Sequence, residues 1–149
     1  MRRVLYIIIL IVMLILPAER MDIGDLLPVE VVQICEEAGV VRICTDTGNA
    51  GIGRNVPEAY SDMKNHANGL IFLDTAEYLI LSGSAESRIN ELTAYLRPSV
   101  AVCRSQENIN LEEAGKYLSF HNSGVRLSDA VQVEKIPLLI IAEEGFAYA

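Results

Sequence analysis

The chain has 149 residues, of which 51% are apolar and 21% are charged, and its formal net charge is −8. This composition is too apolar for a disordered chain, too poor in glycine and proline for a fibrous protein, and too short for more than one ordinary domain. Because phosphate binding needs clustered lysine and arginine, the acidic excess argues against nucleic acid as a partner. It also argues against adsorption to anionic lipid.

The chain begins with a pattern that is typical of an export signal. Two arginines precede thirteen consecutive apolar residues, 4–16, and Pro17 follows them. Thirteen residues are fewer than the roughly 20 that span a membrane, and they fit the apolar region of a signal peptide. Residues 1–18 are therefore expected to be either a cleaved signal peptide or a retained signal-anchor helix. By the positive-inside bias, we expect residues 4–16 to be the membrane contact and residues 19–149 to form one exported domain.

Two β-branched runs predict a hairpin that opens the sheet. The runs cover residues 28–35 and 40–45, and four residues join them. Pairing Cys35 with Val40 places Cys44 about four residues from Cys35 along the ladder, too far for a disulfide. Alternation puts one apolar set on the core face: Val32, Ile34, Val41 and Ile43.

The rest of the chain alternates between helical and strand patterns. A glycine-rich segment, 48–54, is expected to be a flexible loop, because its glycine order matches neither the dinucleotide nor the Walker fingerprint. Asn55 and Asn110 each precede an apolar-periodic segment and have a glutamate three residues on, which is capping-box spacing. The expected helices cover residues 56–67, 85–96 and 111–120, and the expected strands cover 70–73, 78–81, 99–103 and 137–142, the last well buried.

These elements predict an α/β (α+β) domain. The expected architecture is a mixed sheet, opened by the hairpin, with about three helices packed on it. In its core, Tyr60 and Met63 should pack the first helix onto the hairpin and onto two central strands that contain Ile71 and Ile80.

The sequence predicts no metal ion and no cofactor. The cysteines, Cys35, Cys44 and Cys103, are too far apart for a zinc motif, so each is expected to be a small buried apolar group. His66 and His121 fall at the ends of predicted helices, where a cation is favoured without any catalytic role.

Asp46 is the single catalytic candidate. The segment Asp46-Thr47-Gly48 follows a hydrophobic strand and resembles the active-site motif of aspartic proteases, in which two aspartates share a proton and activate water. A chain with one such motif could supply the pair by dimerising. Thr45 and Asn49 flank the motif poorly, however, and a helix follows where those proteases continue in sheet. The segment is therefore expected to be a structural turn.

The order of the elements resembles the N-terminal domain of the Ger(x)C spore germination proteins. Members of that family have an apolar leader and then an acidic-Ile-x-Asp-Leu signature, which the segment 22–26 matches as Asp-Ile-Gly-Asp-Leu. An amphipathic helix, a strand with Phe72, a second strand that ends at Gly83, and a helix followed by Arg97 are similar in order and spacing. The resemblance covers roughly residues 22–120. This chain has neither the cysteine that ends the leader of most members nor their histidine after the Phe strand.

The resemblance implies a non-catalytic, extracytoplasmic interaction module that acts in spore germination or sporulation. It would be membrane-associated or secreted, at the outer face of the cytoplasmic or spore inner membrane of a Firmicutes bacterium. Its partners would be germinant-receptor subunits or other membrane proteins. Two alternatives stay open: a small dimeric aspartic protease that uses Asp46, and an exported binding protein unrelated to germination.

Overall fold

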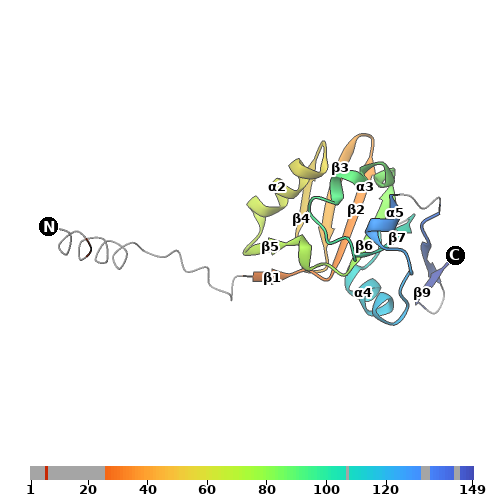
Figure 1. The fold of residues 1–149 in the computed structure, drawn as a ribbon. Helices are drawn as coiled ribbons and strands as arrows, with labels where there is room; N and C mark the ends of the chain where they lie inside the picture. Colours follow the sequence, from red (N-terminus) through yellow and green to blue (C-terminus); the bar gives the residue numbers. More distant parts are fainter. Residues whose placement is uncertain (1–5, 7–25, 107, 132–134, 143–144) are drawn as a thin grey trace.

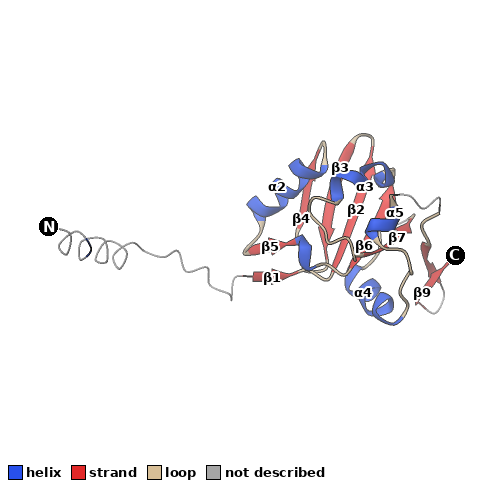
Figure 2. Ribbon diagram, viewed as in Figure 1, coloured by secondary structure: helices blue, strands red, loops and turns tan. Residues whose placement is uncertain are grey.

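The centre of the computed structural model is a mixed sheet of seven strands (Figures 1 and 2). The structure describes residues 6, 26–106, 108–131, 135–142 and 145–149. The strands, in spatial order, are β4 (Ala50–Gly53), β3 (Val40–Thr45), β2 (Val31–Glu37), β6 (Tyr78–Gly83), β7 (Ala101–Ser105), β8 (Leu138–Ala142) and β9 (Gly145–Tyr148). The four central strands, β2, β6, β7 and β8, run parallel, while β3, β4 and β9 are antiparallel to their neighbours. A mixed sheet with a few helices confirms the predicted α+β class.

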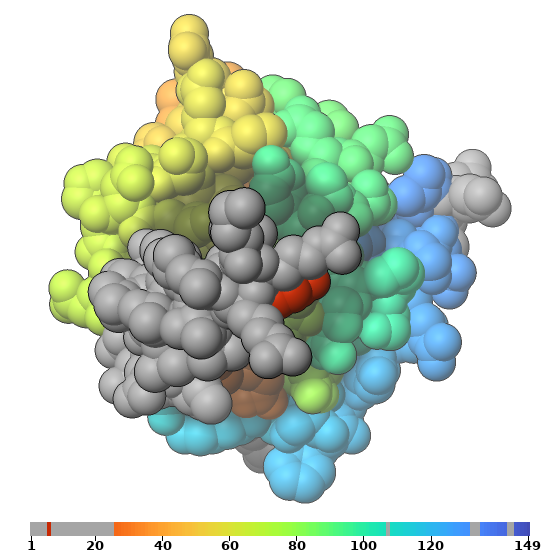
Figure 3. Space-filling view, turned by 60° about the vertical axis from the view of Figure 1, so that its left-hand side comes forward, coloured from red at the N-terminus to blue at the C-terminus, as the bar shows by residue number. Residues whose placement is uncertain are grey.

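Helices cover the sheet on both faces, so the fold has three layers. Helices α2 (Val56–His66), α3 (Ile89–Leu92) and α5 (Leu127–Ala130), with the 3₁₀ turn η3 (Ala85–Arg88), contribute to one apolar cluster. Helix α4 (Leu111–Phe120) contributes to a second cluster, against the other face. Figure 3 shows the α2 and α3 regions, yellow-green and green, side by side on one side of the molecule. The rings of Tyr60 and Tyr95 meet edge to face there, with centroids 5.2 Å apart.

The predicted helix starts are confirmed by their caps. The side chain of Asn55 accepts a hydrogen bond from the Glu58 amide at 2.9 Å, and Asn110 accepts from the amides of Glu112 and Glu113. These bonds satisfy amide groups that a helix N-terminus otherwise leaves without partners. The predicted helix over 85–96 is instead the turn η3 followed by the short helix α3.

The predicted hairpin register is wrong by two residues, although its two faces are right. Only Ala38 and Gly39 form the turn, both at positive φ, and Cys35 lies opposite Arg42 rather than Val40. A shift of two residues preserves the alternation, so the predicted core set, Val32, Ile34, Val41 and Ile43, is fully buried. The other face of β2 is also covered, because Val31 and Gln33 are buried there.

Residues 50–53 form strand β4, not the flexible loop that the glycines suggested. Gly51 and Gly53 are needed because α2 crosses directly over the strand. A Cβ atom on Gly51 would meet the Ala59 carbonyl oxygen and the Met63 amide nitrogen, both backbone atoms of α2. The missing side chains thus allow the helix backbone to touch the strand.

Replacing Gly51 by alanine is expected to lower the free energy of unfolding by about 1–3 kcal/mol, because α2 must move away from β4. Ala50→Val is the matched control, since it adds volume to the same strand at an exposed position. Urea unfolding followed by circular dichroism compares the two. Equal stability of the Gly51→Ala variant and the wild type would contradict the close helix–strand approach.

Two further expectations for the core are wrong, and a third is right in part. Ile71 is buried in the cluster of Met63 and Tyr60, as expected, but it is not in a central strand. It lies in β5 (Leu70–Phe72), which pairs with β1 (Leu26–Pro28) in a separate two-stranded sheet. Ile80 faces the α4 cluster, while its neighbours Leu79 and Leu81 face α2. Strand β8 is mostly exposed, with only Leu139 buried. By contrast, Met63 is buried as predicted, and Tyr60 is half-buried with its hydroxyl donating to the Ile71 carbonyl.

The predicted membrane contact, residues 4–16, and the acidic signature up to Asp25 lie outside the described residues except for Tyr6. Within the part of the chain that the structure describes, no helix is long and apolar enough to cross a membrane.

Candidate functional site

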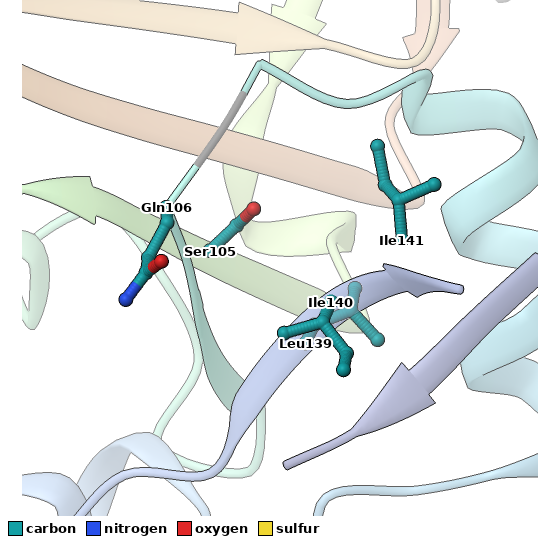
Figure 4. Close-up of a pocket in the computed structure, with 5 residues that line it drawn as sticks. All are labelled: Ser105, Gln106, Leu139, Ile140 and Ile141. Atoms are coloured by element: carbon teal, nitrogen blue, oxygen red, sulfur yellow. The ribbon is translucent and has the colours of Figure 1, made fainter.

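The parallel strands end together at one edge of the sheet, and two hollows open there. Open α/β sheets commonly bind ligands outside the carboxyl ends of their strands. The larger hollow, about 310 Å³, is lined by Leu81, Gly83, Glu86, Arg104, Ser105, Gln106 and Leu138. The smaller, about 230 Å³, is lined by Ser105, Gln106, Leu139, Ile140 and Ile141. Figure 4 shows Ser105 and Gln106 of the smaller hollow on one side and the three β8 residues on the other.

An ion pair from two different elements stands in the larger hollow. Nη1 of Arg104, on β7, lies 2.8 Å from Oε1 of Glu86, on η3, and both side chains are partly exposed. Nε of Arg104 also donates to the Ile136 carbonyl at 3.2 Å, which fixes the plane of the guanidinium. The hollow therefore presents one fixed cation and one anion.

A second, more buried charge network lies at the carboxyl end of β2. The Glu36 carboxylate is 8% exposed and accepts from Nη2 and Nε of Arg88 at 2.7 and 3.2 Å. Arg88 also binds Glu91, whose other oxygen accepts from the Val56 amide at the start of α2. These hydrogen bonds from Arg88 lower the pKa of both carboxyl groups. The network therefore ties β2, α3 and α2 together as ionised groups.

The Asp46 carboxylate is engaged by a backbone amide just before β2. Its two carboxylate oxygens lie 3.3 and 3.2 Å from the Glu30 amide nitrogen, which donates to them. The Asp46 amide in turn donates to the Val31 carbonyl at 3.1 Å. Asp46 thus joins the start of β2 to the turn that follows β3. Residues 46–48 form that turn, as the sequence predicted.

The two histidines stand where the sequence predicted, at helix ends. Nδ1 of His66 is 2.9 Å from the Asp62 carbonyl, and Nδ1 of His121 is 3.2 Å from the Tyr117 carbonyl. His121 also stacks on the Tyr117 ring, with centroids 4.4 Å apart. Each imidazole satisfies a carbonyl in the last turn of its own helix.

The cysteines are free thiols, and only one is buried as predicted. Cys103 is 1% exposed, and burial raises its pKa to about 12. Cys35 and Cys44 are half-buried on adjacent strands, and burial is the main cause that raises the pKa of each. All three therefore stay protonated at neutral pH, which makes them poor nucleophiles. Within the described ranges, no group of three or more His, Cys, Asp or Glu side chains could hold a metal ion.

Among the described residues, no helix covers the α4-side face of β3 and β4. There Val40 and Ile52, on β3 and β4, are 46% and 49% exposed. Arg42 lies opposite Ile52 in the ladder, and Cys35 lies opposite Arg42 on the other side. A hollow of about 160 Å³ is lined by Cys35, Glu37, Val40, Arg42 and Asn108. We call this surface, formed by Cys35, Val40, Arg42 and Ile52, the open sheet face.

One backbone amide at the outer edge of the open sheet face is already bonded within the domain. The Ile52 amide points outward from β4 and donates to the Asp62 carboxylate on α2 at 2.9 Å. Sequence reasoning missed the open sheet face because it assigned residues 48–54 to a loop. The sequence did contain a sign of a strand there, because Gly51 and Gly53 alternate with Ala50 and Ile52, and a period of two is typical of strands.

Comparison with known proteins gives no relatives: no family model, curated protein or solved structure matches the chain.

Proposed function

We propose that this chain is a non-catalytic interaction module that acts in spore germination at the outer face of a membrane. The location rests on the leader pattern of residues 1–18, and the link to germination rests on the resemblance to Ger(x)C proteins. The alternation of helices and strands on which that resemblance was based is consistent with the architecture of the described residues.

The observation that carries the interaction role is the open sheet face. On the same side of the sheet, Val31 of β2 is covered by α4 and is buried. The open sheet face instead exposes Val40 and Ile52 around the cation of Arg42. Exposed apolar side chains with a polar rim are typical of surfaces that bind another protein.

A replacement of Ile52 by glutamate tests this role in the native host. We expect spores with this variant to germinate as slowly as spores without the gene, because a charge in the interface is costly to desolvate. Asn65→Glu is the matched control, since it adds the same charge at an exposed position of α2, on the other side of the sheet. The readout is the fall in optical density after germinant addition, with protein level measured by immunoblot.

Two outcomes would overturn parts of the proposal. Normal germination without the gene, or a host that forms no spores, would remove the link to germination. Normal germination with Ile52→Glu, in spores that require the gene, would show that the open sheet face is not the interface.

The protease alternative is tested through Asp46. We expect the purified protein to be inert toward unfolded peptides at acid pH, with or without pepstatin, because the Asp46 carboxylate is engaged by the Glu30 amide. An acid-optimum cleavage that Asp46→Asn abolishes would restore the aspartic protease as the better reading. Asp62→Asn, at another partly exposed aspartate, is the control.

A further inference from the structure

The hairpin of β2 and β3 brings two thiols together on one side of the sheet, the side of the open sheet face. Cys35 lies opposite Arg42 in the ladder. Cys44 is two residues beyond Arg42 on β3, so the two cysteines are diagonal neighbours on adjacent strands. We propose that Cys35 and Cys44 together bind one soft monovalent metal ion, the cuprous ion. This metal site goes beyond the interaction role proposed above, and it is tested without any partner protein.

The spacing of the two thiols suits a bridging metal ion better than a disulfide. Diagonal neighbours in an antiparallel pair have Cα atoms about 7–8 Å apart, which is beyond the roughly 4.4–6.8 Å that a disulfide needs. Two sulfurs that hold one ion in line, with bonds similar to the roughly 2.3 Å of zinc–thiolate bonds, are about 4.6 Å apart. Because each sulfur rotates about its own Cα–Cβ bond, both thiols can reach one such ion while the strands stay in place.

Both thiols are accessible to a small ion. Cys35 and Cys44 are half-buried, whereas Cys103, the third free thiol, is buried. Cys35 lines the hollow of about 160 Å³ on the open sheet face. Opposite Cys44 on β4 stands Ala50, which is exposed and has only a methyl group as its side chain. An ion can therefore approach the pair from solvent without any opening of the core.

The charge of the bound ion and its ligands would be balanced by Arg42. Soft thiolate ligands favour the cuprous ion and bind it in their deprotonated form, so binding forms two Cu–S bonds and releases two protons to solvent. The two thiolates and the ion then carry one negative charge. Arg42 makes no ion pair or hydrogen bond with any other described residue, which leaves its guanidinium free to balance that charge.

The present state of the two thiols does not oppose the exchange of protons for a metal ion. Burial is the main cause that raises the pKa of Cys35 and Cys44, and the positive charge of Arg42 acts against it at both sites. Cys35 makes one long hydrogen bond, from its sulfur to the Glu37 carboxylate at 3.6 Å. Deprotonation on metal binding costs only this weak bond, and the Glu37 carboxylate beside the site favours a cation.

The experiment is titration of the full chain with cuprous ion, in detergent and without oxygen. Bicinchoninate, a coloured chelator of cuprous ion, competes with the protein and reports how much ion the protein takes up. We expect the wild type to bind one ion per chain. Cys35→Ser and Cys44→Ser are each expected to weaken binding by more than about a hundredfold, since even loss of an outer-shell partner costs about 10–100-fold. Cys103→Ala is the matched control and should bind as the wild type does, because Cys103 is buried on β7.

Absence of cuprous binding by the wild type would overturn the proposal. Unchanged binding in the two serine variants would also overturn it, because the ion would then be held elsewhere. Arg42→Gln is expected to weaken binding by about tenfold, while Lys116→Gln, which removes an exposed charge on α4, should have no effect. Equal binding by these two variants would contradict the role of Arg42.

A second measurement tests the proximity of the two thiols without copper. Dibromobimane becomes fluorescent when it alkylates two neighbouring thiols. We expect the fluorescent product in the wild type and in Cys103→Ala, and its loss in Cys35→Ser and in Cys44→Ser. No fluorescence in the wild type would mean that the thiols are too far apart to share an ion, and it would refute the assignment.

Discussion

Truncation of Ile43 to alanine is expected to lower the free energy of unfolding by roughly 2–5 kcal/mol. Ile43 is fully buried in the middle of β3, opposite Ile34 on β2 and Gly51 on β4, in the cluster that α2 covers. The lost methyl groups would leave a cavity that the fixed backbone of β4 and α2 cannot fill. Since a domain of this size has only about 5–15 kcal/mol of stability, the loss would be a large fraction of the total.

Arg42→Ala is the control for this prediction, because Arg42 is the neighbour of Ile43 and lies on the open sheet face. Its replacement should cause the much smaller change that is usual for surface positions. Urea unfolding of both variants gives the comparison. A greater loss from Arg42→Ala than from Ile43→Ala would mean that the two faces of the hairpin had been exchanged.

Arg88→Ala is the second change with a large expected effect, because it leaves the buried Glu36 carboxylate without its counter-charge. It also removes the bond to Glu91 that ties α3 to the start of α2. We expect its midpoint in urea to fall several times further than that of Arg54→Ala, which breaks the exposed pair with Glu58. Equal shifts in the two variants would show that the Glu36–Arg88 contact does not stabilise the fold.

The same network makes stability depend on pH. Hydrogen bonds from Arg88 lower the pKa of Glu36 and Glu91 in the folded state, so the folded chain binds fewer protons there than the unfolded chain. Their contribution is present above the ordinary glutamate pKa of about 4.3 and is lost as the pH falls through the lowered folded values. In Arg88→Ala, protonation would instead relieve the buried charge of Glu36. The stability difference between wild type and variant should therefore shrink on acidification, as urea titrations at a series of pH values can measure.

The sequence predicted correctly the features that depend on residues close together in the chain, such as helix caps and strand faces. Asn55 and Asn110 cap their helices as predicted, because a cap depends on residues only three positions apart. The faces of β2 and β3 were predicted because the period of two survives any even shift. The register of the hairpin was not predicted correctly, because it depends on a tight turn of two residues, Ala38 and Gly39. Ala38 adopts a positive φ of 51° there, which is uncommon for a residue other than glycine.

Features that depend on contacts between elements far apart in the sequence were not predicted. Gly51 resembles a loop residue until α2 is known to cross it. Strand β8 was expected to be buried for its apolar residues, but it pairs with β7 only at Leu138 and Leu139, so Ile141 extends past its neighbour. Glu86 and Arg104 meet only because β6 and β7 run parallel and bring their ends together. No local pattern marks that pair.

The parallel pairing of β2 with β6 has a consequence for the order of folding. These neighbours in the sheet are separated in the sequence by β3, β4, α2, β5 and the 3₁₀ turn of residues 73–75, which are themselves joined by short connections. Contacts between residues close in sequence form quickly, whereas a parallel seam must wait for a long loop to close. We infer that β2, β3, β4 and α2 assemble first and that the β2–β6 seam forms late. Until it does, the inner edge of β2 is an unpaired strand edge, which can pair with another chain and lead to aggregation.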